Sequence, residues 1–210
     1  MPFDYKKEQK EFYHPKTMPS IIDVPLMNFI VINDKGDPNG ETFATAVEIL
    51  YSLSYAIKMG SKAVFDYVVP PLEGIWWAGC DIADKDKFEW AIMLRQPDFV
   101  TGEVFETAKE SLKTKKKHLD FTAVRLEQFT EGLCAQVMHA GPYNDESATI
   151  DALKKFAEES GYVFDITVDS VKTLSRRHHE IYLSDPRKTA SDKLKTVIRY
   201  PIKRRADFHG

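Results

Sequence analysis

The stretch HHEIYLSDPR, residues 178–187, alternates polar and apolar residues in the pattern that is typical of a half-buried β-strand. Successive side chains of a strand point to opposite faces of a sheet, so Ile181 and Leu183 are expected to pack in the core. Glu180 and Tyr182 then share the other face. A carboxylate in such a strand must reach water or line a cavity with polar partners. Glu180 is therefore the first candidate for a functional residue.

The composition is that of an ordinary globular protein. The chain has 210 residues, which is enough for one large domain or two small ones that share an interface. Its formal net charge of -3 argues against a nucleic-acid-binding protein, because such proteins need a clustered basic surface. The basic run at residues 113–117 fits a solvated helix end better than a nucleic-acid site.

No targeting, membrane or metal-binding signal stands out. Residues 1–16 are charged and lack the apolar segment of a signal peptide, and no run approaches the roughly 20 apolar residues of a membrane helix. Cys80 and Cys134 have no CxxC partner, which predicts two buried free thiols in a cytoplasmic protein. His178 and His179 are neighbours on a strand and face opposite ways. We therefore expect no metal and no cofactor.

Both halves of the chain show the same predicted order of elements: a strand, a turn, a helix and two further strands. In the first half these elements are residues 29–32, 35–40, 42–58, 74–80 and 88–94. In the second half they are residues 133–139, 140–144, 145–160, 165–174 and 177–183. Aligning Pro97 with Pro186, which follow the last strands, places Ala91 opposite Glu180. The acid would then exist in only one copy.

This pattern predicts an α+β fold of tandem duplicated strand–helix–strand–strand units. A single helix covers only one face of its sheet, so two such units must pack together and leave a ligand cleft between them. We expect a charged N-terminal segment and a single following domain that contains two repeats, a connecting helix and a last short helix before a basic tail. The expected bounds are 1–20 for the segment, 21–210 for the domain, about 21–100 for repeat one, 101–118 for the connecting helix, about 121–205 for repeat two and 186–198 for the last helix.

Three motifs carry a resemblance to a known family. They are PLEGIWW at residues 71–77, GPY at 141–143 and EIYLSDPR at 180–187. With them the chain resembles the GyrI-like small-molecule-binding family from about residue 20 to residue 205. The resemblance implies two units around a pseudo-two-fold axis with a ligand cleft between them. In drug-sensing members, a glutamate at the position of Glu180 attracts cationic aromatic ligands.

The resemblance also implies a reaction. Members with tryptophan-rich clefts include enzymes that hydrolyse the cyclopropane of DNA-alkylating cyclopropanoid natural products, and Trp76 and Trp77 resemble that subgroup. Glu180 would be the general base, with a pKa raised by burial against aromatic surface. Tyr143 of the GPY motif would donate a hydrogen bond to the substrate oxygen as negative charge gathers there.

The remaining binding residues follow from position on the strands. Tyr182 shares the face of Glu180, and Glu73 is expected at the rim of the cleft. Trp76 or Trp77 would form a flat wall for a planar substrate, and the other would belong to the core, because adjacent strand residues face opposite ways. Trp90 is expected in the core.

Two other functions stay open. A non-catalytic binding module could sense or sequester cationic aromatic drugs, with Glu180 as the counter-charge and tryptophans for cation–π contacts. A protein-interaction module, such as a gyrase-binding inhibitor, would need an acidic surface; the nearly balanced counts of 29 basic and 32 acidic residues argue against it. The expected partner is a hydrophobic aromatic small molecule rather than a nucleic acid or a membrane.

Overall fold

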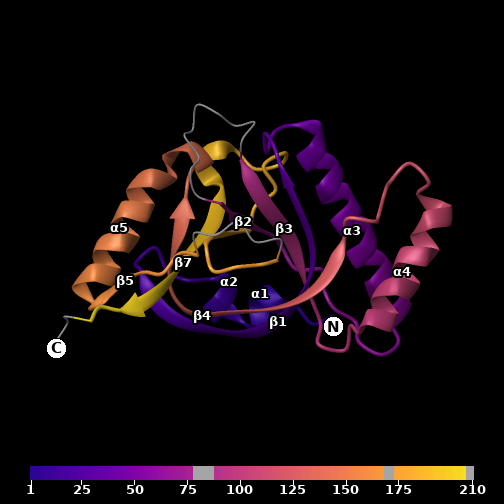
Figure 1. Ribbon diagram of the computed structural model, residues 1–210, viewed down its shortest axis with the longest axis horizontal. Coiled ribbons are helices and arrows are strands. Elements are labelled where there is room, and N and C mark those ends of the chain that lie inside the picture. The colour runs from indigo at the N-terminus through magenta and orange to yellow at the C-terminus, as the bar shows by residue number, and fades with distance from the viewer. Residues whose placement is uncertain (78–87, 168–172, 207–210) are drawn as a thin grey trace.

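The computed structural model describes residues 1–77, 88–167 and 173–206, in which an antiparallel sheet is flanked by helices (Figure 1). The strands are β1 Ser20–Lys35, β2 Leu72–Trp76, β3 Glu89–Gln96, β4 Arg125–Ala140, β5 Tyr162–Phe164, β6 His178–Tyr182 and β7 Lys195–Arg204. The helices are α1 Tyr5–Glu8, α2 Lys10–Tyr13, α3 Glu41–Ser61, α4 Gly102–Lys115 and α5 Glu146–Glu159, with short 3-10 turns η2 Tyr143–Asp145 and η3 Ser191–Lys193. The predicted α+β class is confirmed.

The sheet closes on itself. Its strand order is β4-β1-β3-β2-β6-β7-β5, and a further pairing between β4 and β7 joins the two sides. Two long strands make this closure possible. β1 pairs with β4 through residues 20–31 and with β3 through residues 28–35. The two ends of this long strand therefore pair with different neighbours. The pairing of β2 with β6 connects the first half of the chain to the second.

The strand order corrects the predicted alignment of the two halves. β3 lies between β1 and β2, and β7 lies between β4 and β6, so β6 takes the place of β2 rather than that of β3. The predicted correspondence of Ala91 with Glu180 is therefore wrong. Glu180 instead lies opposite Gly74 across the β2–β6 pair. The duplication itself stays a prediction.

Two predicted elements near the C-terminus differ from the structure. The last short helix expected within residues 186–198 is wrong, because only the turn η3 precedes strand β7. Thr196, Val197 and Ile198 are β-branched and favour the extended backbone, where their side chains pack on both faces of the sheet. The strand expected at 165–174 is absent from residues 165–167 and 173–174; the rest of it lies outside the described residues.

Helices α5 and α3 cover the outer face of the sheet at opposite ends, and α4 packs against α3 (Figure 1). Helix α3 buries a stripe at helical spacing against β1 and β3, as its sequence predicts. Helix α4 confirms the predicted connecting helix, and its N-cap Thr101 accepts a hydrogen bond from the Val104 amide. Helix α5 ends before Gly161, whose φ of 84° suits glycine at this position.

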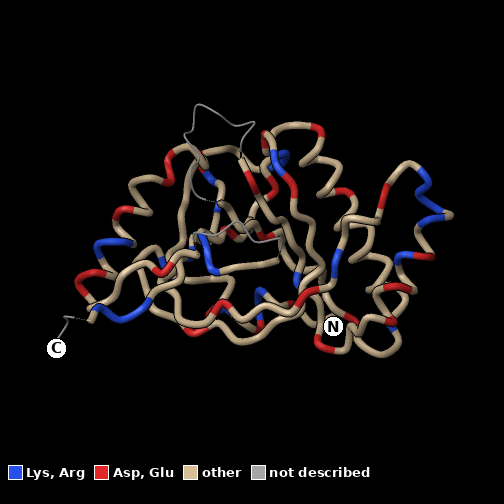
Figure 2. The backbone as a smooth tube through the Cα atoms, viewed as in Figure 1, with Lys and Arg blue, Asp and Glu red and all other residues tan. Residues whose placement is uncertain are grey.

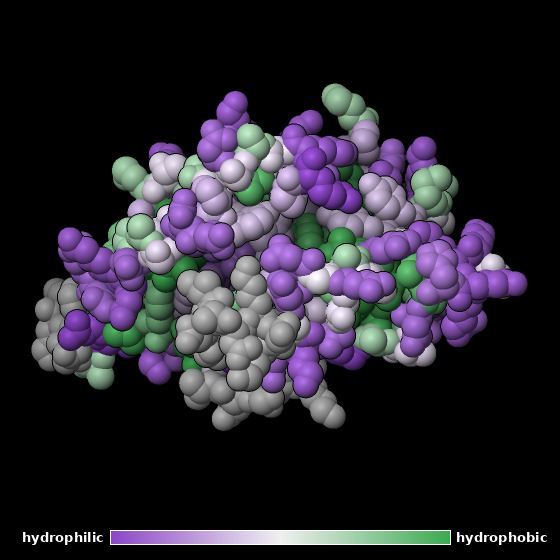
Figure 3. All heavy atoms as spheres, turned by 90° about the horizontal axis from the view of Figure 1, so that it is seen from above, coloured by the Kyte–Doolittle hydropathy of each residue, from purple (hydrophilic) through white to green (hydrophobic). Residues whose placement is uncertain are grey.

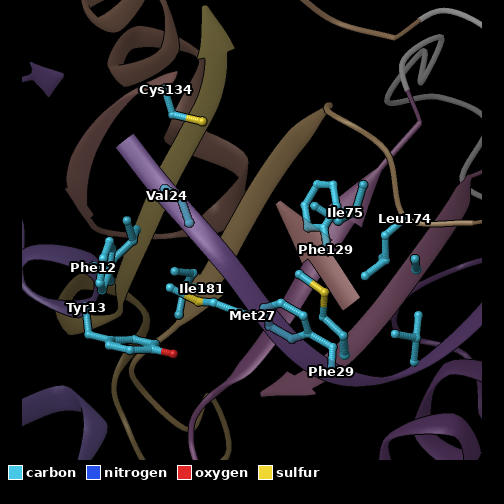
Figure 4. Packing of buried hydrophobic residues seen from close by; sticks show 14 of the residues in the cluster. Phe12, Tyr13, Val24, Met27, Phe29, Ile75, Phe129, Cys134, Leu174 and Ile181 are labelled. Atoms are coloured by element: carbon cyan, nitrogen blue, oxygen red, sulfur yellow. The ribbon is translucent and has the colours of Figure 1, made fainter. Parts of the chain in front are cut away.

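The closed sheet encloses an apolar core, which is separate from the core between the sheet and α3 (Figure 4). Met27 and Phe29 from β1 meet Ile181 from β6 there. The N-terminal segment also reaches this core, because Phe12 and Tyr13 of α2 are 8% and 1% exposed. The charged segment thus carries apolar anchors that its overall composition does not reveal.

One buried ionic network crosses this interior. The ring of His179 lies between two carboxylates, with Nε2 3.0 Å from Glu73 and Nδ1 3.0 Å from Glu131. Arg199 donates to the same Glu131 oxygen at 3.0 Å, and the Tyr13 hydroxyl donates to Glu73 at 3.4 Å. Because carboxylate oxygens accept hydrogen bonds, both ring nitrogens of His179 donate, which requires the charged imidazolium. Two cations therefore balance two anions inside the sheet.

The pKa values follow from this arrangement. Burial alone would lower the pKa of His179, but Glu131 and Glu73 outweigh it and raise the pKa to about 9. Burial alone would raise the pKa of Glu131, but His179 and Arg199 lower it to about 2.

Basic and acidic residues are interspersed along the described chain (Figure 2). On the face seen in Figure 3, apolar side chains form patches between hydrophilic ones. Lys113 and Lys115 lie in the last turn of α4, as predicted for this basic run. Cys134 is a buried free thiol, whereas Cys80 lies outside the described residues. In the ranges that the structure describes, no helix combines the length and apolar character needed to cross a membrane.

The ionic network predicts the effect of removing one of its charges. Glu131→Gln should lower the free energy of unfolding by about 3–5 kcal/mol, because His179 and Arg199 lose a buried counter-charge. Urea unfolding at neutral pH measures this. Glu103→Gln, on the exposed start of α4, is the control and should change stability by less than about 1 kcal/mol. An equal, small change in both variants would contradict a structural role for the network.

The same network predicts a pH dependence of stability. The folded-state pKa of His179 is raised, so its contribution is complete below about 6.5, the pKa of an unfolded histidine. That contribution is lost as the pH rises through about 9. Unfolding free energies measured across this range should therefore fall with rising pH, and a flat profile would count against a charged His179.

Candidate functional site

The candidate site lies on the outer face of the β2–β6 pair, where the two halves of the chain meet. Glu180 and Tyr182 of β6 point to this face together with His178, as their alternation predicts. Gly74 lies directly opposite Glu180, and Trp76 lies opposite His178. One pair of strands thus presents an acid, an imidazole and two aromatic side chains on a single surface.

Aromatic side chains line this face. The Trp76 indole Nε1 donates a hydrogen bond to the Tyr182 hydroxyl at 3.0 Å. Phe43 of α3 stacks on Trp76 with ring centroids 6.2 Å apart, and Tyr143 meets Tyr182 edge to face at 5.8 Å. A Cβ atom at Gly74 would lie 3.0 Å from both Trp76 Nε1 and the Tyr182 hydroxyl. Because glycine has no Cβ, Gly74 leaves space for the hydrogen bond between Trp76 and Tyr182.

The turn after β4 brings Tyr143 to the site. Gly141 has a φ of 139°, a conformation that glycine adopts without strain, and the His139 ring packs 3.5 Å from the position of its missing Cβ. His139 Nε2 donates to the Pro142 carbonyl at 3.1 Å, and Nδ1 accepts from the Thr149 hydroxyl at 2.9 Å. His139 is thus a satisfied structural histidine that fixes the Gly-Pro-Tyr turn.

Glu180 is buried. Of the groups that shift its pKa, only His179 is a cation, and His179 points to the opposite face of β6. Glu180 is 9% exposed, and burial raises its pKa, opposed by a hydrogen bond from Tyr182 and by the charge of His179. His178 Nε2 lies 3.4 Å from a Glu180 oxygen. Burial and the charge of His179 lower the pKa of His178 to about 3, so this contact joins a carboxyl group to a neutral imidazole.

Glu146 is a second acid at the site, which the sequence analysis did not identify. It begins α5, is 6% exposed, and its Oε1 has no hydrogen-bond partner in the described structure. Burial and the charge of Glu180 raise its pKa. An acid in the first turn of a helix is ordinary because the helix dipole favours it, so the sequence offered no signal that singled out Glu146.

Three polar groups converge here closely enough to share an ion or a proton. Glu146, His178 and Glu180 each offer one ligand atom, and these atoms lie within 4.8 Å of one another. Carboxylates and a neutral imidazole are groups that a divalent cation accepts as ligands. The expectation that the chain uses no metal stays a prediction.

The tyrosines at the site keep their protons at neutral pH. Burial, followed by the charges of Glu180 and Glu146, raises the pKa of Tyr143 to about 12. Burial and the charge of Glu180 also raise the pKa of Tyr182 well above its ordinary value. Tyr143 is 38% exposed, so its hydroxyl is able to donate a hydrogen bond to a bound molecule.

Two predicted binding residues lie elsewhere. Glu73 is 2% exposed and belongs to the ionic network inside the sheet, which corrects its expected place at a cleft rim. Trp77 is 8% exposed and packs in the same interior, with the Arg177 guanidinium 4.8 Å from its ring centroid. The alternation of β2 thus resolves the open choice: Trp76 faces the site and Trp77 faces the core. Trp90 is 1% exposed, which confirms its predicted core position.

A large hollow lies away from these residues, in the groove between α3 and α4. It measures about 1560 Å³ and is lined by residues that include Tyr55, Met59 and Val104. Neither Glu180 nor any of the site's aromatic residues lines it. Volume alone therefore does not locate the chemistry, and we place the candidate site where the buried acids and aromatic rings converge.

A model of the GyrI-like small molecule binding domain matches residues 17–203. The chain belongs to the GyrI-like family. Two Listeria innocua structures are similar to it, an uncharacterized conserved protein and a protein described as a hydrolase. Each is 45% identical, matches 96% of this chain and 100% of its own, and superposes with a TM-score of 0.89 or 0.86, respectively. A search of curated proteins found no match.

A more distant structure with a similar fold is the C-terminal domain of EcmrR. It is 12% identical to this chain, with coverage of 89% of this chain and 98% of its own, and a TM-score of 0.58. At this identity the likeness shows the fold alone.

The close fit around Gly74 yields a prediction. Gly74→Ala should lower the free energy of unfolding by about 1–3 kcal/mol, because the new Cβ pushes against Trp76 and Tyr182. In a Trp76→Phe background, which lacks Nε1, the same change should cost clearly less. Urea unfolding of the four proteins of this double-mutant cycle measures the coupling. Equal costs in both backgrounds would show that the two groups do not compete for this space.

Proposed function

We propose that this GyrI-like protein is a hydrolase that detoxifies reactive, flat, hydrophobic electrophiles by adding water to the cyclopropane of cyclopropanoid DNA-alkylating natural products. The observation that carries the proposal is a buried carboxyl group, Glu180, next to the partly exposed rings of Trp76, Tyr143 and Tyr182. The similarity to two Listeria innocua proteins described as hydrolases, at 45% and 44% identity, supports a hydrolytic reaction.

Glu180 would act as the general base. Its raised pKa makes it a stronger base than an exposed glutamate, and the ionised form takes a proton from a water molecule. The oxygen of that water bonds to a cyclopropane carbon while the strained carbon–carbon bond breaks. The electron pair of the broken bond passes to the conjugated carbonyl oxygen of the substrate.

Tyr143 would stabilise the charge that develops on this oxygen. Its hydroxyl stays protonated at neutral pH, because burial and the nearby acids raise its pKa to about 12. A hydrogen bond from it becomes stronger as the oxygen gains negative charge. Tyr143 precedes Glu146 by one turn, so the same short segment supplies the hydrogen-bond donor and the second acid.

The aromatic rings would hold the planar substrate. The hydrogen bond between Trp76 and Tyr182 fixes the orientation of both side chains, and Phe43 supports the far face of the indole. A flat apolar molecule gains contact area against such rigid rings with little loss of side-chain entropy.

A binding module without chemistry is the alternative. The two acids, Glu146 and Glu180, face each other without a lysine or arginine among the groups that shift their pKa values, so a cationic aromatic drug would meet a counter-charge there. In that function the protein protects by sequestering its ligand, with the aromatic rings contributing cation–π contacts.

Replacing the base separates catalysis from binding. Glu180→Gln should lower kcat for cyclopropane opening by about 100-fold or more, because the amide cannot take the proton of water. The dissociation constant for the ring-opened product should change much less. Steady-state kinetics by liquid chromatography and product binding by calorimetry measure the two effects.

Glu89→Gln is the matched control, since Glu89 is an exposed glutamate at the start of the neighbouring strand β3. It should leave both constants unchanged. Full activity in Glu180→Gln would overturn the assigned base. Protection by the wild-type protein that saturates at one ligand per chain, without product, would select the binding module.

A further inference from the structure

Two buried acids meet at the centre of the site. Glu146 comes from the first turn of α5 and Glu180 from β6, and they are 6% and 9% exposed. Ligand atoms of both, together with one of His178, lie within 4.8 Å of each other. The Oε1 atom of Glu146 has no hydrogen-bond partner within the described ranges. A buried, unpartnered carboxyl oxygen beside a second carboxyl group needs a proton or a cation.

The surroundings favour a proton. Among the described residues, five other titratable groups contact the two acids or interact with their charges. On the outer side these are His178 and Tyr182 of β6, Tyr143 of the turn before α5, and Tyr200 of β7. The fifth is His179, which lies on the inner face of β6. Of these only His179 is a cation, and it already lies between Glu73 and Glu131. Two ionised carboxylates at this place would repel each other, and the described part of the chain supplies no neighbouring cation of their own.

We propose that Glu146 is the catalytic acid that works with Glu180, holding the proton that the substrate oxygen receives when the cyclopropane opens. This inference rests on the proposed function and adds a second catalytic residue to it. Tyr143 alone does not suffice as the acid, because its pKa of about 12 makes its hydroxyl a hydrogen-bond donor rather than a ready source of protons. A carboxylic acid gives up its proton more readily.

The cycle balances. Before reaction Glu146 is protonated and Glu180 is ionised. Water gives one proton to Glu180 as its oxygen bonds to the cyclopropane carbon, and the carbon–carbon bond breaks toward the carbonyl oxygen. That oxygen takes the proton of Glu146, so the substrate has gained one molecule of water. The proton on Glu180 then passes to the adjacent Glu146, which restores the starting state without another reactant.

The pH profile distinguishes this role from a structural one. Wild-type activity should rise with pH as Glu180 ionises and fall at higher pH as Glu146 loses its proton. Glu146→Gln should lower kcat by about 100-fold and remove the falling limb, while the rising limb stays, because the amide remains neutral. Glu146→Asp should retain the falling limb, since it restores a titrating carboxyl group. Unchanged kcat in Glu146→Gln, or a retained falling limb, would overturn the proposal.

Glu158→Gln provides the control, because Glu158 lies on the exposed face of the same helix and is substituted in the same way. It should keep the wild-type rate and both limbs of the profile. Incubation with a chelator adds a further arm: activity that is lost with chelator and restored by a divalent cation would assign Glu146, His178 and Glu180 to a metal and would overturn the acid.

A direct measurement separates this inference from the proposed function. In protein labelled with carbon-13 at the glutamate carboxyl groups, NMR titration should show Glu146 still protonated at neutral pH, well above the ordinary glutamate pKa of about 4.3. Assignment uses the Glu146→Gln variant. If Glu146 instead ionises near pH 4.3, the ordinary glutamate pKa, the shared proton and the proposed acid are both excluded. If the proton is found but the wild type opens no cyclopropane, the hydrolase proposal fails while the paired carboxyl groups stand.

Discussion

The pairing of β2 with β6 is the constraint on which the rest of the structure depends. Like the β1–β4 pair, it joins the first half of the chain to the second, and its register places Gly74 opposite Glu180. Because side chains alternate, the same register sends Glu73 and His179 into the interior and Trp76, Glu180 and Tyr182 to the outer face. A slip of one residue would exchange these two sets.

The pKa of Glu131 on the inner face and the pKa values of the acids on the outer face are shifted in opposite directions. Inside the sheet, Glu131 contacts His179 and Arg199, and the charges of these cations outweigh burial and lower its pKa. On the outer face, Glu146 and Glu180 have no such cation in contact among the described residues, and burial raises the pKa of both. Glu131 is therefore fixed as an anion that holds the fold, whereas the outer acids are poised to exchange protons near neutral pH. This contrast is the physical reason to place chemistry on the outer face.

Much of the fold and part of the site could be predicted from the sequence. Periodicity located α3, α4 and α5, and the alternation around Glu180 correctly placed Tyr182 on its face. The alignment of Pro97 with Pro186 failed because the strands before these two prolines hold different places in the sheet. β3 precedes Pro97, whereas β6, which precedes Pro186, corresponds in position to β2. The predicted position of Glu73 at a cleft rim was wrong because its partners are distant in sequence. Without them, a buried acid has the same sequence pattern as an exposed one. Glu146 was missed because only the tertiary fold brings the start of α5 over β6. The apolar anchors of α2 were hidden for the same reason.

In the proposed function, the protein adds water to an electrophile at the aromatic face above Glu180 rather than only holding the electrophile there. Mass spectrometry of a cyclopropanoid incubated with catalytic amounts of the protein in oxygen-18 water tests this most directly. Many product molecules are expected per protein chain, each with one heavy oxygen on the former cyclopropane carbon. Recovery of unchanged substrate, bound at one molecule per chain and free of heavy oxygen, would contradict the proposed function.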